Sequence, residues 1–181
     1  DYKFFGKDTN ITKVTLPKTI QKIGCHYYWD EGEYFKEHGI CYSNLDSNKS
    51  VVEFSVAEDN PYFTSEDGII YNKDKTKLIM YPAGKTDEVF TIPETVTEVA
   101  NFAFANTQVK RIENLDNINE IPMGLFMRSN IEEFPEFTKV KKIEDYAFAY
   151  CNKLKKITIN PRVDVVGRYA FYSCKNATEI D

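Results

Sequence analysis

The chain has 181 residues, of which 42% are hydrophobic and 28% charged, so it is long enough and apolar enough for a folded domain with a substantial core. Its formal net charge of -5 argues against nucleic acid as a partner, because that binding depends largely on Lys and Arg. No apolar run approaches the roughly 20 residues that a membrane-spanning helix needs, so we expect no transmembrane segment.

The first predicted strand covers residues 11–16, where apolar and polar residues alternate. This run, Ile-Thr-Lys-Val-Thr-Leu, has the same apolar spacing as residues 154–159 near the other end of the chain. Ile23 and Tyr28 then repeat the five-residue step that separates Val99 from Phe104. The agreement between these distant segments indicates that one structural repeat runs through most of the chain.

Residues 29–48 interrupt the repeat. The next residue in register is Val51, which implies an insertion of 17 or 18 residues. In and beside this insert, aromatic residues alternate with acidic ones, a composition that suits a protein or glycan contact. The alternative is that the rings only anchor the insert against the rest of the fold. The candidate partner-binding residues are Tyr27, Trp29, Tyr34, Phe35 and Tyr42.

The same region holds the only candidate metal ligands of the sequence, Cys25, His26, His38 and Cys41. Two Cys and two His can complete a tetrahedral zinc site. Cys25 and His26 are adjacent, however, and adjacent side chains converge on one ion only at a sharp backbone bend. A disulfide between Cys25 and Cys41, or two independent thiols, are the alternatives. We therefore predict no bound metal or cofactor, and keep zinc as the alternative.

Residues 57–89 depart from the repeat a second time. Two β-prone runs, 68–72 and 77–81, flank the polar stretch 73–76. Two short runs around a polar turn predict an inserted β-hairpin, which Pro82 and Gly84 close.

Residues 90–181 contain the regular part of the repeat. Apolar residues recur there at steps of 22, 22 and 23 residues, and the clearest column consists of Phe104, Phe126, Phe148 and Phe171. A period of 20–29 residues predicts a leucine-rich-repeat solenoid, because each coil can bury its apolar side chains only against its neighbours. We expect one domain over residues 1–181, a right-handed, β-dominated α/β solenoid with a parallel sheet and a short helical turn at Asp145–Phe148.

The outward-facing residues of the predicted strands alternate in charge. We expect cross-strand ion pairs between them rather than a stripe of one sign. The column consists of Lys13, Glu53, Val89, Arg111, Glu133, Lys156 and Glu179.

Cys151 and Cys174 occupy equivalent positions on successive coils, 23 residues apart. The favoured interpretation is that each fills a small pocket in its turn, since side chains of a ladder point in parallel. A disulfide between them is the alternative.

No catalytic motif occurs, neither a nucleophile elbow, nor a phosphate-binding loop, nor a zinc-protease helix. We therefore predict that the chain is not an enzyme. A metal-dependent or hydrolytic activity centred on residues 25–41 is the alternative.

The unit Val140-x-x-Ile143-x-x-x-Ala147-Phe148-x-x-Cys151-x-x-Leu154-x-x-Ile157-x-Ile159 resembles the BspA-like leucine-rich repeat. Residues 67–82 resemble a hairpin found between repeats of that family. Some units depart from the pattern, with Leu125 in place of Ala and Ala177 in place of Leu. The resemblance implies a secreted or cell-surface bacterial protein with a role in adhesion, and it carries over no catalytic residue.

These observations predict an extracellular interaction module whose partner is a protein or glycan on a host or neighbouring cell. An architectural spacer in a larger surface protein is a further alternative. Because both termini fall inside a repeat, we expect a longer parent protein with a signal peptide or anchor. Apolar residues at the last coil, Ala177 and Ile180, predict weak end-to-end self-association.

Overall fold

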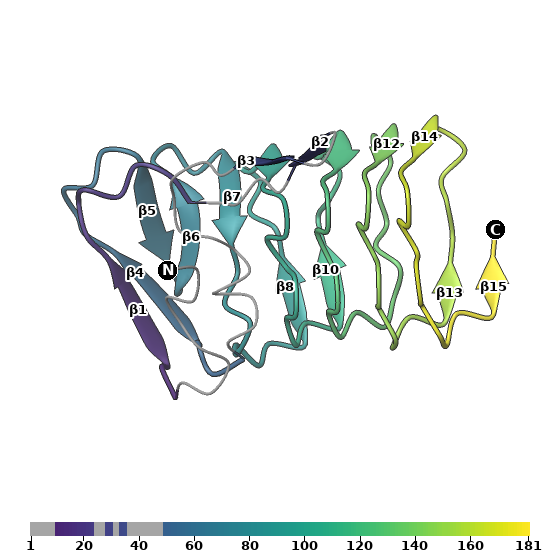
Figure 1. Cartoon of the computed structure of the whole chain (residues 1–181), viewed down its shortest axis with the longest axis horizontal. Helices are drawn as coiled ribbons and strands as arrows, with labels where there is room; N and C mark the ends of the chain where they lie inside the picture. Colours follow the sequence, from purple (N-terminus) through teal and green to yellow (C-terminus); the bar gives the residue numbers. More distant parts are fainter. Residues whose placement is uncertain (1–9, 24–27, 31–32, 36–48) are drawn as a thin grey trace.

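Short strands stack side by side along most of the described part of the chain (Figure 1). The computed structural model describes residues 10–23, 28–30, 33–35 and 49–181. Hydrogen bonds between neighbouring coils join residues 22 or 23 positions apart. The described residues therefore form a β-solenoid, which confirms the predicted fold.

The strands are β1 (Lys13–Leu16), β2 (Tyr28–Asp30), β3 (Glu33–Phe35), β4 (Glu53–Val56), β5 (Phe63–Glu66), β6 (Ile69–Asn72), β7 (Lys77–Met80), β8 (Val89–Thr91), β9 (Glu98–Val99), β10 (Arg111–Glu113), β11 (Glu120–Ile121), β12 (Lys142–Ile143), β13 (Lys156–Ile157), β14 (Val165–Val166) and β15 (Glu179–Ile180). Successive coils pair in parallel, in the orders β1-β4, β8-β10, β11-β12-β14 and β13-β15. Each coil thus contributes short strands to more than one side of the solenoid.

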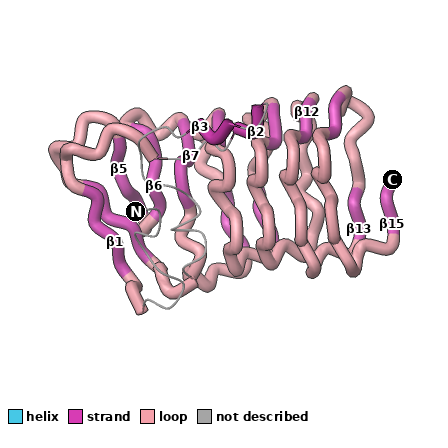
Figure 2. The backbone as a smooth tube through the Cα atoms, viewed as in Figure 1, coloured by secondary structure: helices cyan, strands magenta, loops and turns pink. Residues whose placement is uncertain are grey.

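The helical turn predicted at Asp145–Phe148 is wrong, because residues 145–150 form turns and the described residues contain no helix (Figure 2). The described part of the chain therefore has no helix that could cross a membrane. Tyr146 and Tyr150 have left-handed backbones, with φ of 59° and 61°, which stops a helix from propagating. The amide of Phe148 instead donates to the carbonyl of Ala170 on the next coil, at 2.7 Å. Bonding between coils replaces bonding within a helix.

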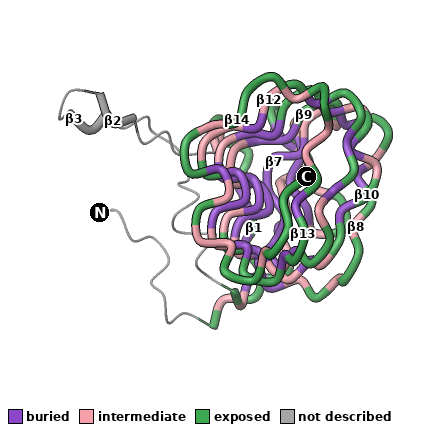
Figure 3. Tube along the Cα trace, turned by 90° about the vertical axis from the view of Figure 1, so that its right-hand side faces the viewer, coloured by how far each residue is buried: buried purple, intermediate pink, exposed green. Residues whose placement is uncertain are grey.

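Phenylalanine rings form the centre of the regular coils. Phe104, Phe126 and Phe148 are at most 1% exposed. Their centroids lie 5.8 Å and 5.1 Å apart, and Phe171 continues the stack 5.4 Å beyond Phe148. An end-on view shows buried residues inside the coils and exposed residues around the rim (Figure 3). The predicted phenylalanine column is therefore the core.

The predicted hairpin corresponds to β6 and β7, which pair antiparallel. The structure adds a third strand, β5, on the other side of β6. It also places β7 in the solenoid itself, because Leu78 pairs in parallel with Val99 of β9. Tyr81, just after β7, stacks at 5.2 Å on Phe104 and so extends the ring column. One strand of the hairpin thus doubles as the strand of a coil.

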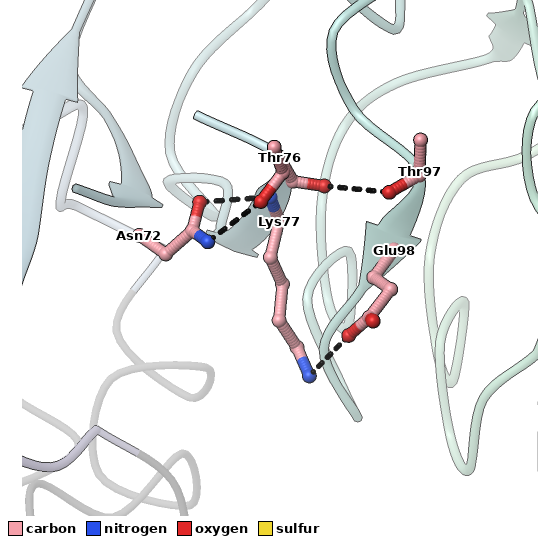
Figure 4. A network of polar contacts seen from close by, with 5 residues as sticks. All are labelled: Asn72, Thr76, Lys77, Thr97 and Glu98. Carbon is pink, nitrogen blue, oxygen red and sulfur yellow. Dashed lines mark hydrogen bonds and ion pairs between the residues drawn. The ribbon is translucent and has the colours of Figure 1, made fainter. Parts of the chain in front are cut away.

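Polar contacts fasten this junction (Figure 4). The side-chain amide of Asn72 donates to Thr76 Oγ1 at 2.8 Å, and its oxygen accepts from the backbone N–H of Lys77 at 2.8 Å. Lys77 reaches across to Glu98 on β9 at 3.0 Å. The hydroxyl of Thr97 lies 3.5 Å from the carbonyl oxygen of Thr76. These bonds hold the hairpin turn against the following coil.

Candidate functional site

The predicted site residues fall into two groups. Cys25, His26, His38 and Cys41, together with Tyr27 and Tyr42, lie outside the described residues. Trp29, Tyr34 and Phe35 lie in β2 and β3, whose backbones pair antiparallel with Trp29 opposite Tyr34 and Phe35 opposite Tyr28. The insert therefore contains a short β-ribbon that brings the backbones of three predicted binding residues together.

No group of three or more His, Cys, Asp or Glu in the described part of the chain is arranged to hold a metal ion. The pKa values of one carboxylate pair are shifted in opposite directions. Partial burial and the hydrogen bond with Glu144 raise the pKa of Glu120. Burial acts to raise the pKa of Glu144 as well, but hydrogen bonds from Lys142 and Glu120 lower it. Both carboxylates reach solvent beside the strand pair β11-β12, where Lys142 forms an ion pair with Glu144.

The strand face carries the predicted cross-strand ion pairs. Lys13 lies 2.6 Å from Glu53, and Lys156 lies 2.9 Å from Glu179. Arg111 approaches Glu133 at 3.7 Å. These side chains are 44% to 66% exposed, so each pair contributes at most about 1 kcal/mol. The face is charge-balanced and offers no stripe of one sign to a charged polymer.

The cysteines of the regular coils belong to a column of small side chains in the turns, which also contains Thr107 and Ser129. The Cys151 thiol donates to the carbonyl of Phe126 at 3.0 Å, and the Cys174 thiol donates to that of Phe148 at 3.1 Å. Burial raises the pKa of Cys151 to about 12. Both thiols are free. They fill turn pockets, as the favoured interpretation predicts, and a thiol with so high a pKa is a poor nucleophile.

A second polar cluster closes the hairpin. The hydroxyl of Tyr81 donates to Asp87 Oδ2 at 2.5 Å, and Lys85 donates to the same oxygen at 2.8 Å. Lys85 also lies over the ring of Tyr81, 5.6 Å from its centroid. The hydrogen bonds from Lys85, the larger cause, and from Tyr81 lower the pKa of Asp87. The pKa of Tyr81 is raised mainly by burial and also by its hydrogen bond to Asp87. Every group in the cluster is satisfied by another, which marks it as structural.

A hollow of about 490 Å³ lies between β4 and the turn that joins β5 to β6. It is open to solvent, and charged residues such as Glu53, Asp67 and Lys85 are among those lining it. Glu53 is already paired with Lys13, and Lys85 with Asp87. This hollow lacks the enclosure and the convergent free polar groups of a small-molecule site.

Sequence reasoning missed one exposed cluster, which we call the tyrosine surface: Tyr146, Tyr150, Tyr169 and Tyr172. Tyr146 stacks on Tyr169 at 5.3 Å, Tyr172 meets Tyr169 edge-on at 5.5 Å, and Tyr150 meets Tyr172 edge-on at 5.4 Å. Arg128 lies over the ring of Tyr150, 5.2 Å from its centroid. The signal in the sequence was a Tyr before each of two Ala-Phe pairs, at Tyr146 and Tyr169.

Comparison with known families agrees with this fold. Residues 85–181, more than half of the chain, match the BspA type leucine rich repeat region in six copies. None of the curated protein sequences matches the chain significantly.

Three solved bacterial structures resemble the chain. The pneumococcal vaccine antigen PcpA superposes with a TM-score of 0.76 at 25% identity, over 94% of this chain and 38% of that one. A leucine rich cell surface protein from Faecalibacterium prausnitzii gives 0.64 at 19% identity, over 95% and 48%. A leucine-rich repeat protein from Eubacterium ventriosum gives 0.55 at 23% identity, over 94% and 36%. The chain thus spans less than half the length of each.

Proposed function

Because the chain belongs to the BspA-type leucine-rich-repeat family, we propose that it is an extracellular, non-catalytic interaction module. It presents its solenoid surface and the insert at residues 29–48 to a protein or glycan on a host or neighbouring cell. One similar structure is named a cell surface protein and another a vaccine antigen. We propose the same cell-surface location for this chain.

The hydrogen bonding of the buried polar side chains supports the non-catalytic part of this proposal. The buried polar side chains in the described residues are Asn60, Thr107 and Ser129. Asn60 bonds four backbone groups, and Thr107 donates to the carbonyl of Phe104. No buried side-chain N or O atom of the described residues lacks a hydrogen-bond partner. Active sites gather titratable groups in a pocket, whereas these three buried side chains are not titratable and bond to backbone groups or to a neighbouring side chain of the coils.

Binding assays test the proposal. Purified chain is measured by biolayer interferometry against a panel of extracellular-matrix proteins and on a printed glycan array. We expect saturable binding to at least one probe, weakened tenfold or more when a Gly-Ser linker replaces residues 29–48. A Lys13→Ala/Glu53→Ala variant, which changes only an exposed ion pair of the strand face, serves as the matched control and should bind normally.

Three results would contradict the proposal. The first is the absence of saturable binding to any probe, and the second is equal binding by the linker variant, which would remove the insert from the binding surface. The third is stoichiometric zinc in the purified chain, lost in a Cys41→Ser variant together with a hydrolytic activity. That result would favour the metal-dependent alternative centred on residues 25–41.

A further inference from the structure

We propose that the tyrosine surface, with Arg128, binds an acidic segment of a partner protein. This inference rests on the proposed function and specifies a surface and a partner chemistry for it. The surface lies on the turns of the regular coils, separate in sequence from the insert at residues 29–48.

Tyr146 is 38% exposed. Tyr172 and Tyr169, on the last described coil, are 49% and 57% exposed, and Tyr150 is half-buried. The coil of Tyr146 has neighbours on both sides, since β12 pairs with both β11 and β14. Tyr146 is therefore exposed because of its place in the turn, and stacking of coils does not cover it.

The left-handed backbone of these tyrosines recurs in the turns of successive coils, where backbone hydrogen bonds between coils hold it. Tyr146, Tyr150 and Tyr169 have φ of 59°, 61° and 56°, a left-handed region that is costly for bulky residues. Gly124, with φ of 60°, occupies the position of Tyr146 on the preceding coil. Phe102 occupies it one coil earlier with φ of 59°, and its ring fills the space beside Gly124, so an aromatic ring is usual at this position and only its exposure differs.

The polar edges of the surface are free. None of the four tyrosine hydroxyls forms a hydrogen bond with another described residue. A phenol that combines an exposed ring with a free hydroxyl can pack on apolar groups and bond a peptide backbone or carboxylate at once. This combination explains why Tyr, with Arg, is enriched at the centre of protein interfaces.

One cation lies against a ring of the surface and two more are close to it in sequence, while the Asp145 carboxylate beside Tyr146 accepts from the backbone N–H of Arg168 at 2.6 Å. Arg128 lies on Tyr150, Arg168 precedes Tyr169, and Lys175 follows Tyr172 by three positions. Within the described part of the chain, no carboxylate forms an ion pair with any of these three side chains, whereas cations of the strand face such as Lys13 and Lys156 are paired. Local charge complementarity between these cations and the carboxylates of a partner favours an acidic segment.

Selection from a displayed library of random twelve-residue peptides tests the inference on the full chain. We expect the enriched peptides to carry net negative charge and to bind more weakly as salt is raised. A Tyr169→Ser/Tyr172→Ser variant and an Arg128→Ala variant should each lose at least tenfold in affinity. Tyr62→Ser is the matched control, because Tyr62 is also exposed, at 46%, but lies beside β5. Thermal unfolding midpoints of all variants check that the fold is kept.

The possible outcomes separate this inference from the proposed function. Enriched peptides without acidic excess, or equal affinity in the Tyr169→Ser/Tyr172→Ser variant, would overturn the inference. Peptides that lose affinity only when residues 29–48 are replaced would also overturn it and leave the proposed function standing. Binding of acidic glycans on the array, with no peptide enriched, would overturn the choice of a protein segment. A chain that binds neither peptides nor glycans nor matrix proteins would overturn both proposals.

Discussion

Replacing Phe148 by Ala tests whether the ring column holds the solenoid together. Phe148 is 0% exposed, and its centroid lies 5.1 Å from that of Phe126, 5.0 Å from Phe134 and 5.4 Å from Phe171. Truncation of a buried Phe to Ala costs about 3–5 kcal/mol. Three ring contacts are lost here, from both neighbouring coils, so we expect about 4–5 kcal/mol, near the upper end of that range.

Urea denaturation followed by circular dichroism measures this loss. With slopes of about 1–3 kcal/mol per molar urea, the midpoint should fall by more than about 1 M. Tyr62→Ala is the control, because an exposed ring should cost less than about 1 kcal/mol. The reasoning is refuted if Phe148→Ala behaves like the control, since the ring column would then contribute little to stability.

Four further outcomes follow from the described contacts. Leu78→Ala should lower the free energy of unfolding by about 2–5 kcal/mol in urea denaturation, because this fully buried side chain belongs to a coil. Faster amide hydrogen exchange in the hairpin alone, with no change in global unfolding, would mean that the hairpin does not contribute to the stability of the solenoid. Asn60→Ala should cost about 2–4 kcal/mol in the same assay, because four backbone groups lose their partner. Hydrogen bonds from Lys85 and then Tyr81 lower the pKa of Asp87. The Asp87 carboxylate therefore stabilises the folded state at pH 7, and this contribution is lost as the pH falls through its folded-state pKa. The difference in free energy of unfolding between wild type and Asp87→Asn should shrink in denaturation curves below about pH 4. Burial raises the pKa of Cys151 to about 12, so as the pH rises the thiol is deprotonated in the unfolded chain before it is in the folded one. The free energy of unfolding should therefore fall above about pH 8.5, and it should fall less steeply with pH in Cys151→Ala.

The regular coils were predictable because each side chain of a column meets its own equivalents on the neighbouring coils. Phe126 lies between Phe104 and Phe148, so one requirement for a buried ring is repeated every 22 residues. The charges of the strand face follow the same logic, because the parallel register places Lys13 beside Glu53 and Lys156 beside Glu179. A short period in the sequence therefore determines both the core and one exposed face.

The role of β7 could not be read from the same period. Tyr81 follows Leu78 by three positions, whereas Phe104 follows Val99 by five. The hairpin reaches the ring column by a shorter path and supplies Tyr in place of Phe, so neither the spacing nor the residue type matched the column. Only the pairing of β7 with β9 shows that this strand belongs to the solenoid.

Recurrence also separates packing from function in this chain. A residue that recurs in every coil, such as Phe148, is explained by its neighbours and needs no partner outside the molecule. Gly124 and Tyr146 occupy one left-handed position on successive coils, and only glycine adopts that conformation without cost. Tyr146 and Tyr169 also stack on each other across neighbouring coils, so stacking accounts for the placement of these two rings. Their exposure is what distinguishes them from the buried rings a few residues away, and it leaves them accessible to the partner segment that we propose.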